Sequence, residues 1–260
     1  MPTTQKISKK KILDGIDKKE KVVEISHLQK SFDGKEILSD VNLDLYRGES
    51  IVVLGKSGQG KSVLIKCIIG LMVPDAGEIN VFGQDIINIK EKDLNEIRKK
   101  IGFLFQGGAL YDSMTVRENL AFPLIQNKVT RNTDEIEALI DDVLDSVGLL
   151  EAKDKMPSEL SGGMKKRIGL ARTLILKPEI ILYDEPTTGL DPIISKGISN
   201  LILKVQEKYR TSSIIITHDI KCAKITANRM YFLKNGKILR EGEYSDFKSD
   251  EEESIKEFFT

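Results

Sequence analysis

The segment Gly55–Ser62 constrains the fold of this chain more than any other part of its sequence. It reads GKSGQGKS and fits the pattern G-x-x-x-x-G-K-[ST]. It follows the apolar, β-branched run Ser50–Leu54, which is typical of a buried parallel strand, and it precedes a helical stretch that reaches about Ile69. A strand, a glycine-rich turn and a helix in this order predict an α/β domain built around a parallel sheet.

The same pattern assigns a chemical task to each part of this loop. Its glycines allow backbone N–H groups to surround phosphate oxygens. Lys61 would bring positive charge to the β- and γ-phosphates, Ser62 would offer a hydroxyl to Mg²⁺, and the following helix would direct its positive dipole end at the anion. The predicted nucleotide-binding residues are Gly55, Lys56, Ser57, Gly58, Gln59, Gly60, Lys61, Ser62 and Val63.

Two adjacent carboxylates follow a second apolar run, Ile180–Tyr183. At the end of a strand beside the phosphate loop, Asp184 can hold Mg²⁺ through water. Glu185 comes where the chain turns at Pro186, and it can orient or deprotonate a water for attack on the γ-phosphate. An apolar run before two acids is also an ordinary strand end, so this interpretation depends on the phosphate loop. Two acids with separate tasks indicate hydrolysis as well as binding.

His218 follows another β-rich run, Ser213–Thr217, and is one of only two histidines. A lone histidine is often a satisfied structural residue. However, ligands of open α/β sheets bind at the carboxyl ends of parallel strands, which is where this residue is expected. His218 could therefore hydrogen-bond the γ-phosphate or the attacking water.

Composition restricts the partners of the chain. Its 260 residues include 40 Lys and Arg and 40 Asp and Glu, and this balance does not support a nucleic-acid binder. No run approaches the roughly 20 apolar residues of a membrane-spanning helix, and the N-terminus has no secretory signal. Cys67 and Cys222 are expected to be reduced thiols of an intracellular protein. Any membrane role is therefore expected to come through a partner.

The rest of the chain alternates strand-like and helix-like segments. Residues 115–160 contain no clear strand, and the apolar spacing of Thr133–Val147 predicts a helix. We expect a flexible polar extension over 1–20, a domain over 21–245 and an acidic tail over 246–260. The run Asp250–Glu253 is expected to be solvated, while Ser254–Thr260 could pack on the domain or on a second copy. The other predicted strands are Val22–Leu28, Val41–Leu45, Glu78–Phe82, Ile101–Phe105, Met230–Leu233 and Lys237–Arg240, with turns at Asp33–Gly34 and Asn235–Gly236.

The sequence Leu160–Met164, LSGGM, precedes a predicted basic helix over Lys165–Leu176. Together with the phosphate loop and the paired acids, it resembles the nucleotide-binding domain of ABC transporters over residues 22–245. Other residues that match family motifs are Gln106 of the Q-loop, Asp191 of the D-loop, the switch histidine His218, and Phe32, which would stack on adenine. The resemblance implies a P-loop NTPase fold: a RecA-like parallel core, an antiparallel β subdomain, and an α-helical subdomain over about 107–165.

The resemblance also implies how the site is completed. Ser161, Gly162 and Gly163 would form a second anion cradle that closes on ATP held by a second cassette, with Asp191 at the interface. The catalytic residues would be Glu185, His218 and Gln106. The ligands of Mg²⁺ would be Ser62, Gln106 and Asp184. The implied partners are a second copy of the cassette and a membrane permease.

The segment from Phe105 to Leu124 resembles one branch of this family, the Mla/Mce-type ATPases of lipid transport. Met164 also occurs in that branch, in place of the usual glutamine. The resemblance implies an MCE-domain lipid-binding partner and a peripheral position on the cytoplasmic face of the inner membrane. A cassette for a small solute and a non-transport ABC ATPase are the alternatives. Leu110, Tyr111 and Met114 would line a groove for the permease or would close the core of the helical subdomain.

Overall fold

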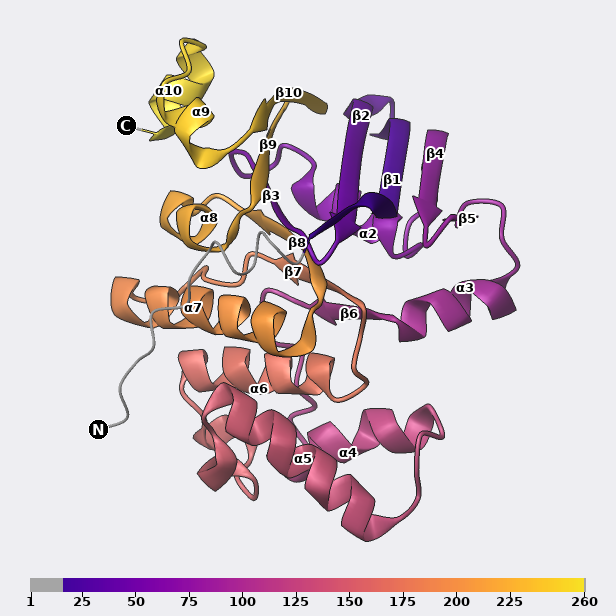
Figure 1. Cartoon of the computed structure of the whole chain (residues 1–260), viewed down its shortest axis with the longest axis vertical. Helices are drawn as coiled ribbons and strands as arrows, with labels where there is room; N and C mark the ends of the chain where they lie inside the picture. Colours follow the sequence, from indigo (N-terminus) through magenta and orange to yellow (C-terminus); the bar gives the residue numbers. More distant parts are fainter. Residues whose placement is uncertain (1–15, 260) are drawn as a thin grey trace.

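The strands of the chain form one curved sheet in a computed structural model, which describes residues 16–259. Within this range the strand order is β5-β4-β1-β2-β10-β9-β3-β8-β7-β6 (Figure 1). The strands are β1 Asp17–Phe32, β2 Lys35–Arg47, β3 Ser50–Leu54, β4 Ala76–Val81, β5 Gln84–Asp85, β6 Ile101–Leu104, β7 Ile180–Asp184, β8 Ser212–Thr217, β9 Arg229–Lys234 and β10 Lys237–Gly242. The helices are α2 Lys61–Ile68, α3 Glu91–Lys99, α4 Val116–Gln126, α5 Thr133–Val147, α6 Gly162–Leu174, α7 Pro192–Tyr209, α8 Ile220–Thr226, α9 Tyr244–Lys248 and α10 Glu253–Phe259.

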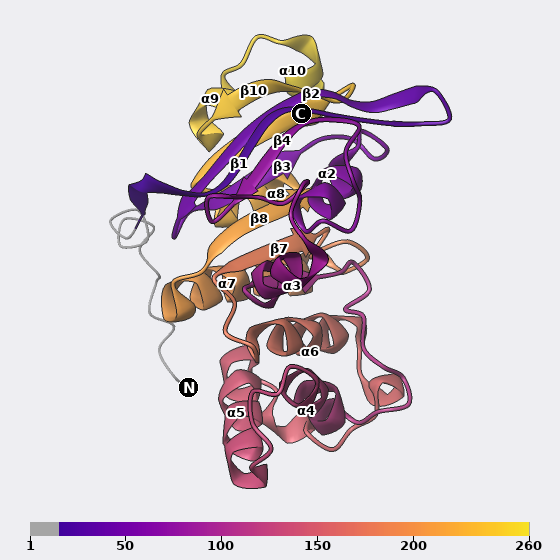
Figure 2. The ribbon, with the colours of Figure 1, turned by 90° about the vertical axis from the view of Figure 1, so that its right-hand side faces the viewer.

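The parallel half of the sheet contains β9, β3, β8, β7 and β6. All five residues of β3 are buried, because helices cover both faces of the sheet (Figure 2). Ile51 and Val53 belong to the apolar cluster that contains α2, whereas Val52 and Leu54 belong to the cluster that contains α6 and α7. This alternation is the period of a strand buried on both faces. The predicted strand Ser50–Leu54 is confirmed, and so is the α/β core.

The antiparallel half is built from hairpins. Asp33 and Gly34 both have positive φ, 48° and 76°, in the turn between β1 and β2. Asn235 and Gly236 have φ of 48° and 74° between β9 and β10. Positive φ at both central residues is the geometry of the tight hairpin turn that these dipeptides favour. Both turn predictions are therefore confirmed.

The segment between β6 and β7 is helical and lies at one end of the molecule (Figures 1 and 2). Helix α5 has the predicted bounds, Thr133–Val147. Helix α6 begins at Gly162, three residues before the predicted start, because the Ser161 hydroxyl caps it by accepting from the Met164 N–H at 3.3 Å. It ends at Leu174, so the predicted bounds Lys165–Leu176 are wrong at both ends.

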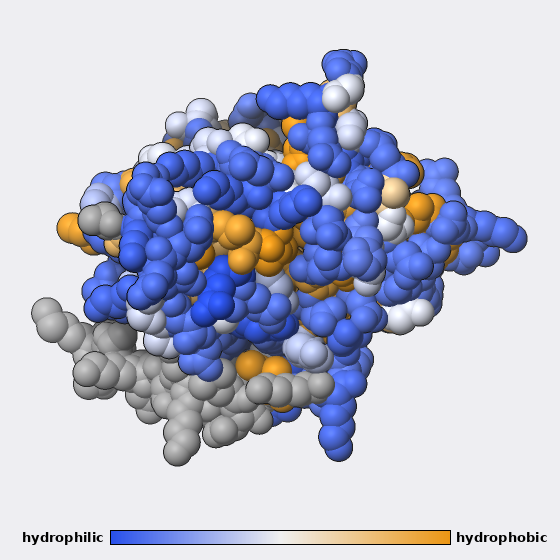
Figure 3. All heavy atoms as spheres, turned by 90° about the horizontal axis from the view of Figure 1, so that it is seen from above, coloured by the Kyte–Doolittle hydropathy of each residue, from blue (hydrophilic) through white to orange (hydrophobic). Residues whose placement is uncertain are grey.

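The C-terminal segment packs on the domain. Its helices α9 and α10 bury Phe247 and Ile255 in the apolar core, and the rings of Phe258 and Phe232 meet edge to face at 5.3 Å. Asp250 pairs with Arg240 at 3.0 Å, and its side chain is only 11% exposed. The predicted solvated run is therefore wrong at Asp250, because packing of the aromatic side chains brings the acidic run against β10. Figure 3 shows the face over these helices as mostly hydrophilic, with apolar residues gathered near its centre.

The predicted N-terminal extension lies mostly outside the described residues, which begin at 16. Its last residues, from Asp17 on, already belong to β1. Within residues 16–259, no helix combines the length and the apolar character needed to span a bilayer.

Candidate nucleotide site

The phosphate loop and the ends of the parallel strands enclose a cleft of about 380 Å³. The loop follows β3, and α2 begins at Lys61. Gln106 follows β6, Glu185 follows β7 and His218 follows β8, so the topology brings these three side chains to one edge of the sheet. The cleft is lined by Phe32, Ile37, Ser57, Gly58, Gly60, Lys61, Ser62, Val63, Gln106, Glu185, Thr188 and His218.

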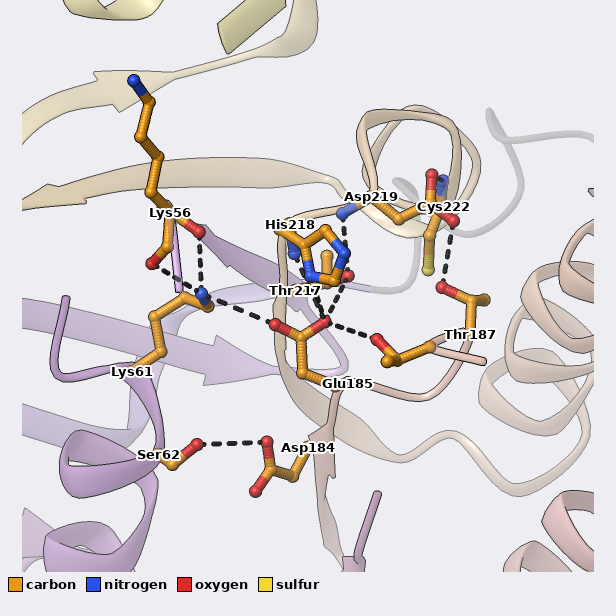
Figure 4. Close-up of polar contacts among 12 residues, drawn as sticks. Lys56, Lys61, Ser62, Asp184, Glu185, Thr187, Thr217, His218, Asp219 and Cys222 are labelled. Carbon is orange, nitrogen blue, oxygen red and sulfur yellow. Dashed lines mark hydrogen bonds and ion pairs between the residues drawn. The ribbon is translucent and has the colours of Figure 1, made fainter. Parts of the chain in front are cut away.

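The side chain of Lys61 points back toward the start of the loop, at Lys56 (Figure 4). Its side chain is 6% exposed, and its ammonium donates to the carbonyl oxygens of Gly55 at 2.7 Å and Lys56 at 3.1 Å. It lies 3.5 Å from Glu185 Oε1. Gly60 has φ of 95°, and a Cβ there would lie 2.8 Å from a methyl of Leu38. Glycine is therefore favoured here, because a side chain would strain the backbone and push the loop away from β2.

Ser62 and Asp184 form a second polar pair, with 3.4 Å between the hydroxyl and Oδ1 of the carboxylate. Burial raises the pKa of Asp184, and the hydrogen bond from Ser62 opposes that rise. A hydroxyl and a carboxylate are oxygen ligands of the kind that Mg²⁺ prefers, and a divalent cation would favour the charged carboxylate. Among residues 16–259 no group of three or more His, Cys, Asp or Glu side chains surrounds a cation site.

The carboxylate of Glu185 is held on several sides. Its Oε2 accepts hydrogen bonds from the hydroxyls of Thr188 at 3.0 Å and Thr217 at 3.2 Å, and it lies 2.9 Å from His218 Nδ1. Burial acts to raise the pKa of Glu185, but His218 and Lys61 outweigh it, and the pKa lies below its usual value. The group is therefore ionised at neutral pH. Neither threonine is among the predicted site residues, although each lies within three residues of one.

Phe32 and Gln106 complete the cleft. Phe32 ends β1, its side chain is 41% exposed, and the ammonium of Lys30 lies 5.5 Å from its ring centre. Gln106 is exposed just beyond β6. An exposed aromatic ring at the mouth of a polar cleft offers a flat apolar face, which suits stacking on a base. Two other loop residues have partners outside the cleft: Gln59 Oε1 accepts from Asn235 N at 2.6 Å, and Lys56 pairs with Glu257 at 3.4 Å.

The four remaining predicted residues do not line this cleft, and neither do Gly55, Lys56, Gln59 and Asp184. Ser161 caps α6, and Gly162 and Gly163 form its first turn. A Cβ on Gly163 would lie 2.7 Å from Ile194, so this turn packs against α7. Asp191 caps α7 by accepting from the N–H groups of Ile193 and Ile194 at 2.9 and 3.0 Å. Within one chain, the Ser161–Gly163 turn therefore does not take part in the cleft of the phosphate loop.

Other hollows adjoin the domain. A larger one, about 810 Å³, lies between α7 and α8 and shares Thr188 and His218 with the cleft, but no residue of the phosphate loop lines it. The nucleotide site is therefore the smaller cleft. A third hollow of about 200 Å³ lies between the sheet and the helical segment, where Phe103, Phe105, Pro123 and Arg172 line it.

The loop beside the third hollow is held by the side chain of Asn119, which lies within the segment from Phe105 to Leu124. Asn119 is fully buried, and its amide donates to the carbonyl oxygens of Tyr111, Met114 and Thr115 at 3.0 to 3.1 Å. Tyr111 remains 41% exposed and lies under Arg172, whose guanidinium is 4.5 Å from its ring. Leu110 packs partly against the core. Leu110 therefore fits the prediction that this segment closes the core of the helical subdomain. Tyr111 lies on the surface, as a residue of a docking groove would.

A glycine-rich loop between a parallel strand and a helix, facing two strand-end acids, defines a phosphate-loop nucleotide-binding protein. Residues 38–188 match the family model described as ABC transporter. The chain belongs to the ABC transporter family and is an ATP-binding cassette with ATPase activity.

Curated relatives carry transport names of several kinds. The chain is 40% identical over 236 residues to the probable ribonucleotide transport ATP-binding protein mkl of Mycobacterium leprae, covering 91% of this chain and 68% of that one. It is 39% identical to the methionine import ATP-binding protein MetN of Legionella pneumophila, covering 84% and 63%. It is 37% identical to the intermembrane phospholipid transport system ATP-binding protein MlaF of Haemophilus influenzae, covering 85% and 83%. The chain thus spans about two thirds of the length of the first two.

Solved structures confirm the predicted P-loop NTPase fold. The ATP-binding cassette MJ0796, in a dimeric post-hydrolysis state bound to ADP and Pi, has a TM-score of 0.78 and 31% identity, covering 85% of this chain and 98% of that one. The protein cbiO1 of Clostridium perfringens, part of the ABC transporter complex cbiONQ, has a TM-score of 0.82 and 29% identity, covering 90% and 92%.

Proposed function

We propose that this chain is the ATP-hydrolysing subunit of a lipid transporter of the Mla/Mce type. It works as a dimer of cassettes coupled to a membrane permease. The observation that carries the ATPase part is the convergence of Lys61, Glu185 and His218 on one cleft. The cargo part rests on the likeness to the phospholipid transport protein MlaF and on the resemblance of the segment from Phe105 to Leu124.

The nucleotide is bound by the loop and its neighbours. Lys61 and the loop N–H groups hold the phosphates, while Phe32 stacks on the adenine. Ser62, Gln106 and Asp184 hold Mg²⁺, which supplies positive charge to the phosphates when bound. The 3.4 Å separation of Ser62 and Asp184 supports this ligand set.

Glu185 is the general base or water-orienting group for hydrolysis. Its lowered pKa keeps it charged, and the contact with His218 at 2.9 Å fixes the direction of its carboxylate. His218 is also placed to reach the γ-phosphate, because it lines the same cleft. Gln106 links this chemistry to the helical segment, since it stands where β6 leads into that segment.

The cleft of one chain is completed by a second chain. Ser161, Gly162 and Gly163 expose N–H groups at the positive end of α6 but lie outside the cleft of their own chain. In a dimer they close on the nucleotide bound by the partner, and Asp191 lies at the interface. MJ0796 is dimeric with ADP and Pi, which supports this arrangement.

The permease docks in the hollow between the sheet and the helical segment. Phe103, Phe105 and Pro123 give this hollow an apolar lining, and Tyr111 is exposed beside it. The chain is then peripheral to the membrane, on the cytoplasmic face of the inner membrane in a bacterium. An MCE-domain lipid-binding protein completes the assembly.

A small-solute importer is the second candidate, because identity to MetN is as high as identity to MlaF. The experiment that separates the two is affinity purification of a tagged Glu185→Gln chain from gently solubilised membranes, followed by mass spectrometry of proteins and lipids. A permease with an MCE-domain protein and phospholipid supports the lipid assignment. A permease with a solute-binding protein overturns the cargo, and ribosomal or DNA-repair partners without a permease overturn the transporter role.

A further inference from the structure

Helix α6 carries a buried lysine whose side chain reaches the backbone of Glu185. Lys166 is only 6% exposed, and its ammonium donates a hydrogen bond to the Glu185 carbonyl oxygen at 3.2 Å. Burial lowers the pKa of Lys166, while the charges of Asp184 and Glu185 act in the opposite direction. A desolvated cation is costly unless it is paired or hydrogen-bonded. The two acids and this carbonyl oxygen therefore offset the cost of burying the Lys166 ammonium.

The backbone of Glu185 needs such support. Its φ is 48°, in the left-handed region that residues with a Cβ rarely occupy. Such a conformation is strained and persists only where the surroundings hold it. The N–H of Glu185 donates to the Ile216 carbonyl at 2.9 Å, which ties it to β8. The bond to its carbonyl comes from α6, a different layer of the molecule.

One face of α6 makes contacts with three separate parts of the chain. Lys166, Gly169 and Thr173 are spaced by three and four residues, so they share this face. A Cβ on Gly169 would lie 2.7 Å from the Gly108 carbonyl oxygen, and the Thr173 hydroxyl donates to the Phe103 carbonyl at 3.3 Å. The face that touches Glu185 therefore also touches the chain on both sides of Gln106 and a residue that lines the proposed permease hollow.

We propose that Lys166 is a positioning residue for hydrolysis: it holds the Glu185 backbone in its left-handed turn and makes the direction of the carboxylate depend on where α6 lies. The inference rests on the proposed role of Glu185. Because α6 also contacts the permease hollow and begins with the Ser161–Gly163 cradle, a shift of this helix reaches Glu185 through Lys166. No other buried lysine among residues 16–259 contacts the Glu185 backbone, since Lys61 meets its carboxylate.

The test removes the hydrogen bond and keeps the packing. Lys166→Met retains an unbranched side chain of similar length without the donor. We expect kcat for ATP hydrolysis to fall at least about tenfold while KM changes less than about threefold, because a small misdirection of a catalytic group lowers the rate without weakening binding. Lys165→Met is the matched control: it is the adjacent lysine of the same helix, half-buried, and it should stay within about twofold of wild type. Lys166→Leu, which also lacks a donor, is a second variant with the same expected split between kcat and KM, should Lys166→Met not fold.

A second readout separates positioning from a general defect of α6. In the Glu185→Gln background, ATP affinity and ATP-driven dimerisation should be unchanged by Lys166→Met, because Lys166 acts only through Glu185. Loss of dimerisation in the double variant overturns the inference, since it would show that the substitution damages the cradle at the start of α6. A kcat of Lys166→Met within about twofold of wild type also overturns it.

The role of Glu185 and the positioning role of Lys166 are contradicted by different results. If Glu185→Gln hydrolyses ATP at the wild-type rate, the proposed role of Glu185 is wrong, whatever Lys166 does. If Glu185→Gln is inactive and both Lys166 variants hydrolyse normally, only the positioning role of Lys166 is wrong.

Discussion

Lys61 is the residue whose side chain most directly fits an anion. It is almost fully buried, and it lies between loop carbonyl oxygens and Glu185. Lys61→Ala should weaken MgATP binding at least about hundredfold, because charge-assisted bonds to phosphate are among the strongest in proteins. Isothermal titration calorimetry measures this loss. Lys92→Ala, an exposed lysine of α3, is the control, and normal affinity of the Lys61 variant would contradict the phosphate role.

The two buried cysteines should make the stability of the protein depend on pH. Cys67 and Cys222 are free, each 1% exposed, and burial raises the pKa of both thiols to about 11. A thiol whose pKa is higher in the folded state stabilises the fold at pH values below its pKa in the unfolded state. That contribution is lost as the pH rises toward its pKa in the folded state. The free energy of unfolding should therefore fall between about pH 9 and 11.

At about pH 8 neither native thiol should react quickly with a disulfide reagent, whereas both should react in denaturant. Rapid reaction in the native state would contradict their burial.

At the scale of elements, the C-terminal helices act as part of the core. Phe247 of α9 is 1% exposed and packs in the same apolar cluster as β9 and α7. Phe247→Ala should lower the free energy of unfolding by roughly 3 kcal/mol, through lost burial and the cavity left behind. Urea unfolding followed by circular dichroism measures the change, with the exposed neighbour Lys248→Ala as the control. Equal stability of the two variants would show that α9 contributes nothing to the core.

How well the sequence predicts an element depends on how local its signal is. The strand Ser50–Leu54 and the helix Thr133–Val147 are predicted with their observed bounds, because apolar spacing marks them without help from neighbours. Helix α3 contains only two apolar residues, Leu94 and Ile97, and buries only Ile97, so it has few apolar positions to mark it. The acidic run before α10 suggested a tail, since its pairing with Arg240 is a contact between separate elements. The phosphate loop has a local pattern that the sequence alone reveals, whereas the bond from Lys166 to Glu185 depends on how α6 packs and no local pattern contains it.

At the scale of the whole molecule, Lys61, Glu185 and His218 line the cleft of one chain, and the Ser161–Gly163 turn at the start of α6 does not. Under the proposed function, that turn of a second chain completes the cleft. Glu185→Gln should therefore remain monomeric without nucleotide and form a dimer with ATP, because hydrolysis can no longer reopen the pair. Multi-angle light scattering after size-exclusion chromatography measures the mass directly.

A signature variant makes the dimer prediction specific to this pair of surfaces. A Cβ on Gly162 would meet only a methyl of Leu190 at 3.6 Å, an ordinary contact, so Gly162→Asp should fold normally. Its carboxylate would repel the phosphates presented by the partner. In the Glu185→Gln background, Gly162→Asp should abolish ATP-driven dimerisation and leave ATP binding to the single chain within about threefold, since the cradle is not part of that chain's own cleft. A dimer of unchanged mass would mean that the chains associate through another surface, and loss of ATP binding by the monomer would mean that the cradle serves its own cleft.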